Sequence, residues 1–182
     1  LEFSAIPNLP PAKGDVQALL DSRPRYASDL KENELANVFD GNVDSHWTIH
    51  GPDHWVEVSF GRPMAAAGVE LRHGKLEYYR NPSGACAVKG CTFQAFVDGK
   101  WQTMGTPVTD HPRYQGEGDD AYAIRQTFKP VTARRFRVLV TASTDTGKRL
   151  SSPKKVCVAE DKRATYLREL ILYSPDGSSL MR

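Results

Sequence analysis

The chain has 182 residues, 40% of them hydrophobic, and its 24 basic and 22 acidic side chains leave a net charge of +2. This length fits one domain with a substantial core and is short for two, and no apolar run approaches the roughly 18 residues of a membrane-spanning helix. The 12 Pro and 14 Gly residues are spread along the chain, which favours many short elements joined by turns over long helices.

Helical patterns are confined to the N-terminal part. Residues 14–21 and 28–38 have the apolar spacing of short helices. In the second segment Ser28 is the expected N-cap, and Leu30 and Leu35 are expected to face inward. We therefore predict one or two short helices near the N-terminus.

Residues 1–30 are expected to be an extension or linker, and residues 31–182 to be the domain. The sequence begins Leu1-Glu2-Phe3 without Met, and no signal peptide remains in it. We interpret the chain as an excised or mature piece of a larger multidomain protein, with its first residues as candidates for vector sequence.

Three later segments alternate apolar and polar residues with the period of two that is typical of half-buried strands. The expected inward-facing sets are Val56, Val58 and Phe60, then Phe93, Ala95 and Val97, and then Phe136, Val138 and Val140. The dipeptide Asp98-Gly99 readily adopts the positive φ angles of a tight hairpin. The pattern predicts an all-β fold, an antiparallel β-sandwich.

Oxygen-bearing side chains cluster in residues 36–47, around Gly41 and just before Trp47. This composition suits a tight loop that wraps a hard cation and then enters a strand. Far downstream, Glu169 is a lone carboxylate within the apolar segment 166–172. The alternative interpretation is an ordinary Asx-turn in the loop, with Glu169 as a rim carboxylate paired to an arginine.

These two segments resemble the two ends of a discoidin-type domain, the galactose-binding-like β-sandwich shared by coagulation-factor C-type domains and family 32 carbohydrate-binding modules. Three fragments between them are similar to family strands and occur in the family's order, namely WVEVSFG at 55–61, FVDGKW at 96–101 and FKPVTARRFRV at 128–138. The resemblance covers about residues 36 to 174. It implies a jelly-roll sandwich that binds a ligand and catalyses no reaction.

The resemblance also implies a structural calcium ion that ties the first long loop to the last strand. Carried over by position, its ligands are the carboxylates of Asp40 and Glu169, the hydroxyl and carbonyl of Ser45, and the backbone carbonyls of Asn37, Asn42 and Arg168. Ser45 stands where the family more often has Thr, and Asn42 where it often has Asp. Because this ligand set carries less negative charge, we expect weak calcium binding.

A sugar site is expected in the loops at one end of the sandwich, where aromatic faces and hydrogen-bonding groups gather. Arg72 matches the position of the arginine that receives galactose-type sugars in family 32 modules. The full set of candidate ligand-binding residues is His50, Arg72, His73, Tyr79, Asn81 and Tyr166. For Tyr79 packing is the alternative role, and for His50 and His73 it is exposure without a ligand.

The cysteines leave two interpretations open. Cys86 and Cys91 are spaced to close a small disulfide loop, which would leave Cys157 unpaired and indicate an oxidising compartment. Three buried, reduced thiols acting as small hydrophobes are the alternative.

Catalytic and nucleotide-binding signatures are missing from the sequence: it has no Gly-x-Ser-x-Gly elbow, His-Glu-x-x-His helix, Walker loop or dinucleotide fingerprint. Basic residues gather in segment 148–163 but are not interleaved with aromatics as in nucleic-acid-binding motifs. We therefore predict a non-catalytic carbohydrate-binding module of a secreted or cell-surface bacterial protein, for galactose-type sugars. The alternatives are a domain that binds a protein or an anionic surface, such as an acidic glycan or a lipid head group, and a structural spacer.

Overall fold

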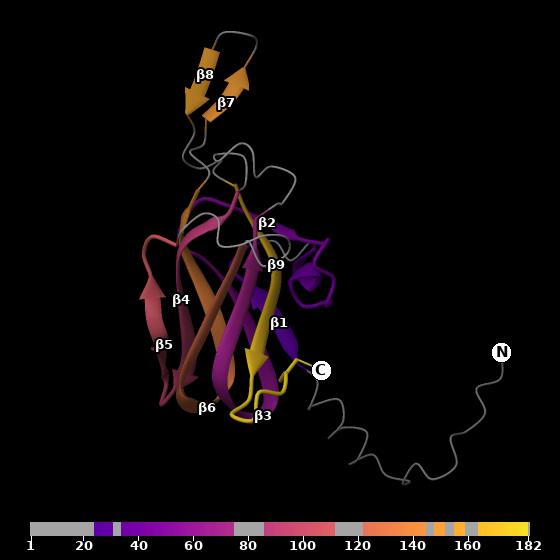
Figure 1. Ribbon diagram of the computed structural model, residues 1–182, viewed down its shortest axis with the longest axis vertical. Helices are drawn as coiled ribbons and strands as arrows, with labels where there is room; N and C mark the ends of the chain where they lie inside the picture. The colour runs from indigo at the N-terminus through magenta and orange to yellow at the C-terminus, as the bar shows by residue number, and fades with distance from the viewer. Residues whose placement is uncertain are drawn as a thin grey trace, which may run out of the picture.

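The fold consists of antiparallel strands arranged in a sandwich (Figure 1). The computed structural model describes residues 24–30, 34–74, 86–111, 122–144, 148–151, 155–158 and 164–181. Its strands are β1 (Arg25–Ser28), β2 (Trp47–His50), β3 (His54–His73), β4 (Val88–Val97), β5 (Lys100–Val108), β6 (Ala123–Ser143), β7 (Lys148–Ser151), β8 (Lys155–Val158) and β9 (Ala164–Tyr173). The main sheet has the order β2-β9-β3-β6-β4-β5, with β1 also paired to β3, and β7 and β8 form a separate hairpin.

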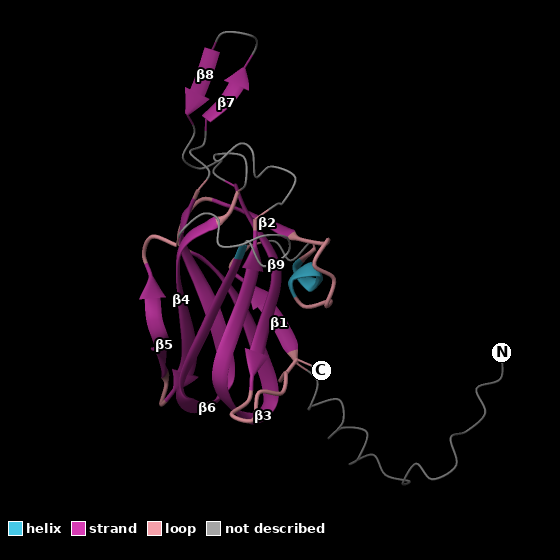
Figure 2. Cartoon of the chain, in the orientation of Figure 1, coloured by secondary structure: helices cyan, strands magenta, loops and turns pink. Residues whose placement is uncertain are grey.

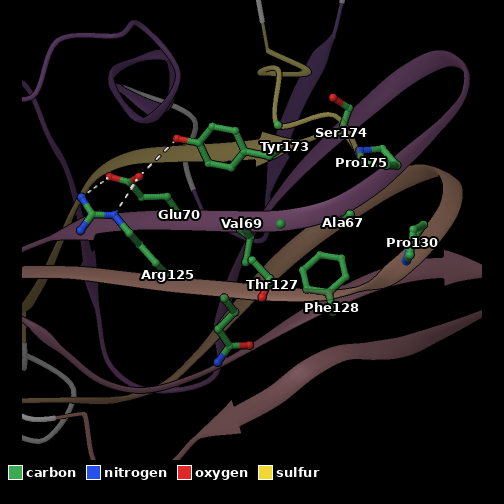
Figure 3. Close-up of a pocket in the computed structure, with 13 residues that line it drawn as sticks. Ala67, Val69, Glu70, Arg125, Thr127, Phe128, Pro130, Tyr173, Ser174 and Pro175 are labelled. Carbon is green, nitrogen blue, oxygen red and sulfur yellow. Dashed lines mark hydrogen bonds and ion pairs between the residues drawn. The ribbon is translucent and has the colours of Figure 1, made fainter.

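Two long strands connect the layers of the sandwich. β3 has 20 residues and β6 has 21, and they pair antiparallel along almost their whole length. Register shifts between Ser59 and Met64, and between Ala66 and Gly68, interrupt this pairing. Figure 3 shows both ribbons curving round at the same end, beside Ala67 and Pro130. Each strand therefore contributes one half to each layer.

The core lies between the layers and is built from the residues that the alternation predicts. The side chains of Val56, Val58, Phe60, Phe93, Ala95, Phe136, Val138 and Val140 are all buried, and Val97 packs against them as a partly buried residue. Burial of aliphatic and aromatic side chains is the main driving force for such a sandwich. The predicted fold class is confirmed.

The hairpin between β4 and β5 has the predicted conformation. Asp98 and Gly99 adopt φ angles of 50° and 76°, and Val97 pairs with Lys100 across the turn. These positive values match the right-handed twist of the flanking strands.

The predicted helix over 28–38 is wrong in extent. Within the described residues it is reduced to one 3-10 turn, η1 (Leu35–Val38), which Figure 2 shows as a short cyan segment. Ser28 ends β1, and its hydroxyl accepts a hydrogen bond from the Leu30 N–H at 2.9 Å, so it caps a local turn. Leu35 is buried as expected. The other predicted helix, 14–21, lies outside the described residues.

Strand β1 pairs with β3 from Arg25 opposite Ser59 to Ser28 opposite Val56. The sheet thus includes residues that precede the expected domain boundary at residue 31.

Cys86 and Cys91 are both buried and are not bonded to each other, so the disulfide interpretation does not describe this structure. Burial raises the pKa of Cys91 to about 12, as desolvation disfavours the thiolate. The side chain of Cys157 lies outside the described part of the chain. In the portion that the structure describes, no helix has the length and apolarity needed to cross a membrane.

Candidate functional site

The loop between η1 and β2 gathers oxygen atoms around the hydroxyl of Ser45. Ser45 Oγ lies 2.8 Å from Asp40 Oδ2, 2.8 Å from the carbonyl of Asn42 and 3.4 Å from the carbonyl of Asn37. The amide of Asn37 donates to the carbonyl of His46 at 3.0 Å, which holds the two ends of the loop together. The four predicted loop ligands are therefore neighbours in space.

Glu169, on β9, completes this group from the sheet side. Asp40 and Glu169 line the same cavity of about 350 Å³, and Glu169 is only 6% exposed. Burial, and after it the negative charge of Glu169, raises the pKa of the nearby Tyr26. The Nε of the adjacent Arg168 donates a hydrogen bond to the Val43 carbonyl, so β9 is tied directly to the loop.

These groups fit a hard cation. Calcium prefers six to eight oxygen ligands from carboxylates, carbonyls and hydroxyls, and two carboxylates, one hydroxyl and two carbonyls face this region. The described residues contain no cluster of three or more His, Cys, Asp or Glu side chains arranged for a metal, so any site here depends on the loop backbone. The Asx-turn of the alternative interpretation is also present, because Asp40 Oδ1 accepts the Asn42 N–H at 2.8 Å.

His50 and Tyr166 share one face of the β2–β9 pair. His50 lies opposite Ala164 and Tyr166 opposite Thr48, so the two side chains are diagonal neighbours. His50 is exposed and Tyr166 is partly buried. The ring of Tyr166 meets that of His46 edge to face, with centroids 4.6 Å apart. This face combines an aromatic surface with imidazole hydrogen-bonding groups, as a sugar site requires.

Arg72 lies further along the sheet and forms an ion pair. Its Nε donates to Glu70 Oε1 at 2.7 Å, and its side chain is 24% exposed. Glu70 also accepts from Arg125 and from the Tyr173 hydroxyl, at 3.2 Å each. Burial alone would raise the pKa of Glu70, but the hydrogen bonds from Arg125 and Arg72 outweigh it and hold the pKa below its usual value.

His73 is fully buried at the end of β3. Its Nδ1 accepts a hydrogen bond from the Val88 N–H at 3.1 Å, and its ring meets the rings of His111 and Tyr122 edge to face. Burial, followed by the nearby His111 and Arg168, lowers the pKa of His73 to about 3. In this position the imidazole is neutral and packs in the interior.

The remaining predicted ligand residues, Tyr79 and Asn81, lie outside the described residues. The cluster of Glu70, Arg125 and Tyr173 was missed by sequence reasoning because its members come from three strands. A signal was nevertheless present, since Glu70 is a charged residue at an alternating position between apolar Val69 and Leu71.

The two-layered sandwich, with an oxygen-rich loop packed on its last strand, defines a discoidin-type module. The chain belongs to the F5/8 type C domain family, whose model matches residues 25–152. The predicted family is thereby confirmed. None of the curated protein sequences compared with the chain matches it.

Solved structures with the same fold include carbohydrate-binding modules. The family 32 module of Streptococcus pneumoniae EndoD has 16% sequence identity and a TM-score of 0.57, over 85% of this chain and 98% of that one. The CBM32 of AlyQ, in complex with 4,5-unsaturated mannuronic acid, has 14% identity and a TM-score of 0.53, over 82% and 93%. At these identities the likeness establishes the fold.

Some similar chains are much longer. The chain spans 27% of the length of SpGH29, with 20% identity and a TM-score of 0.56 over 85% of this chain.

Proposed function

We propose that this domain is a non-catalytic carbohydrate-binding module that receives galactose-type sugars at the end of the sandwich formed by β2 and the start of β9. The observation that carries the proposal is the exposed His50 beside Tyr166 on one face of these strands. An aromatic ring covers the C–H face of a sugar, and imidazole nitrogens bind its hydroxyls.

The solved structures of similar fold support the ligand class. Among them is a chitosan-binding module from Paenibacillus sp. IK-5 in complex with chitotriose, with 17% identity and a TM-score of 0.53 over 85% of this chain and 97% of that one. Arg72 is not part of this proposed site, because its Nε is hydrogen-bonded to Glu70. A shallow site on exposed strands and loops excludes little water, so affinity for a single sugar should be weak.

We also propose that calcium binds between the loop and β9 through Asn37, Asp40, Asn42, Ser45, Arg168 and Glu169. The gathering of the loop oxygens around Ser45 and the cavity shared by Asp40 and Glu169 support this assignment. The ion would hold the loop against the sheet and so has a structural role.

The module is proposed to belong to a secreted or cell-surface multidomain protein that processes or adheres to glycans. There it would raise the local concentration of its partner domains on a polysaccharide. The alternative functions, binding of a protein or anionic surface and a spacer role, rest partly on the basic segment 148–163, whose side chains are not described.

Backbone amide NMR during a galactose titration in calcium tests the sugar site. We expect shifts concentrated at residues 46–51 and 164–167, with a Kd on the order of millimolar. Replacing His50 by Ala should weaken binding about tenfold, because it removes the imidazole hydrogen bond. Lys100→Ala, in the distant β4–β5 hairpin, serves as the control. Shifts elsewhere, or equal affinities of the two variants, would refute the assignment.

A further inference from the structure

A groove of about 710 Å³ runs along the outer surface of the sandwich near the bends of β3 and β6. Figure 3 shows Tyr173 and Pro175 on one side of it, Phe128 and Pro130 on the other, and β3 between them. Its size falls within the range of small-molecule sites. Figure 1 shows β2 at the opposite end of the sandwich from these bends, so this groove is separate from the proposed sugar site.

The middle of the groove is apolar and open. Gly68 lies on the floor of the groove and has no side chain to fill it. A Cβ atom at this position would lie 3.5 Å from the Gln126 carbonyl oxygen and 3.5 Å from Tyr173 Cβ. Phe128 is partly buried against the core, which fixes one wall. Aromatic and proline faces of this kind pack against the C–H surface of a sugar ring.

One end of the groove is polar and contains an exposed arginine. Glu70 receives Arg125 Nε at 3.1 Å and Arg72 Nε at 2.7 Å, so one carboxylate is surrounded by two guanidinium groups. The Arg125 side chain is 50% exposed, whereas that of Glu70 is 7% exposed. Arg125 is therefore the most exposed charged group of the three.

A buried carboxylate lies beside this cluster, since Glu169 is opposite Arg72 in the β3–β9 register and only 6% exposed. Lys129 and Asp176 adjoin the lining residues in sequence and have opposite charges. Asp176 is held within its own turn, where Ser178 Oγ donates to its Oδ1 at 2.7 Å. The groove thus has an apolar middle and an exposed guanidinium group, that of Arg125, at one end.

We propose that this groove is a second saccharide site, specific for a sugar chain that contains uronic acid. A uronate presents a C–H face and a carboxylate on the same ring, which matches the apolar walls and the exposed Arg125. Guanidinium groups recognise carboxylates by charge-assisted hydrogen bonds. The groove proposal depends on the proposed function only for the class of ligand, a saccharide, because the residues that line the groove differ from those of the first site.

The test uses tetragalacturonate as the probe, followed by backbone amide NMR on the full chain in calcium. Shifts are expected at residues 67–70, 125–128 and 173–177. A neutral tetrasaccharide of galactose should bind at least about fivefold more weakly to this groove, because it lacks the carboxylates.

Thr127 provides a matched pair of variants that leaves Glu70, Arg72 and Arg125 themselves unchanged. It is exposed and lines the groove, so both Thr127→Glu and Thr127→Gln should fold. We expect the Glu variant to lose about fivefold or more in affinity for tetragalacturonate, through charge repulsion, and the Gln variant to stay within about twofold of the wild type.

Equal affinities of these two variants, no binding of the acidic probe, or shifts confined to residues 46–51 and 164–167 would overturn the groove proposal. Failure of the galactose titration at His50 would overturn only the first site.

Discussion

His73 is held in the interior by packing and by a hydrogen bond from the Val88 N–H. In the folded protein the pKa of His73 is lowered to about 3, whereas an imidazole in the unfolded chain has a pKa near 6.5. Between these values the unfolded state binds a proton that the folded state does not. The stability that buried, neutral His73 contributes is therefore fully present above about pH 6.5 and is lost progressively as the pH falls towards 3.

This linkage predicts that the free energy of unfolding falls by about 2 kcal/mol between pH 7.5 and pH 5 because of His73 alone. Urea unfolding of a His73→Gln variant, whose side-chain carbonyl can still accept the Val88 N–H, should show a correspondingly smaller fall. Exposed His50, replaced by Gln, is the control and should keep the wild-type dependence. A His73→Gln variant with the wild-type dependence would show that His73 titrates normally in the folded state.

Arg72 and His73 show how far the positions and contacts of single side chains could be predicted from the sequence. Their residue types suggested a ligand site, but Val69 and Leu71 face the core, and continuing their alternation turns His73 inward and Arg72 outward. The inward position of His73 could therefore be predicted from the alternation. The ion pair of Arg72 was not, because its partners Glu70 and Arg125 are brought together only by strand pairing.

Among the elements, strands were predicted well where alternation is strict and poorly where the chain bends. One half of β3 and one half of β6 follow from the apolar alternation at 56–60 and 136–140, and the Asp98-Gly99 hairpin follows from its turn chemistry. That each pair of halves is one continuous bent strand depends on the non-local register of β3 and β6. The outer groove lies at these bends, so no local sequence pattern predicts it.

The loop before β2 and the strand β9 are expected to be joined by calcium, which makes stability depend on the ion. At a calcium concentration of about 100 times the Kd the folded state gains about 2.7 kcal/mol, or a rise in Tm of roughly 5–10 °C for a chain of this size. Thermal unfolding with calcium and with a chelator measures this difference.

Asp40→Asn should abolish most of the calcium-dependent rise in Tm, since it removes a charged ligand. Asp44→Asn is the matched control, because Asp44 is an exposed residue of the same loop outside the proposed ligand set. An unchanged Tm in the wild type, or the same rise in both variants, would favour the plain Asx-turn.

For the whole molecule, the family resemblance predicted the sandwich and its ligand class from fragments spread over the chain. The family match over residues 25–152 and the sandwich confirm the fold. Ligand identity could not be obtained in the same way, because one fold supports many sites. It depends on side chains such as His50, Tyr166 and Arg125, whose neighbours are set by tertiary structure.

A glycan-array screen of the purified chain in calcium, at low and at physiological salt, tests the central claim most directly. The account predicts retention of glycans that end in galactose or N-acetylgalactosamine at both salt concentrations, since contacts with neutral sugars are not screened. Retention of no glycan at either concentration would contradict a carbohydrate-binding function and would indicate a protein partner or a spacer.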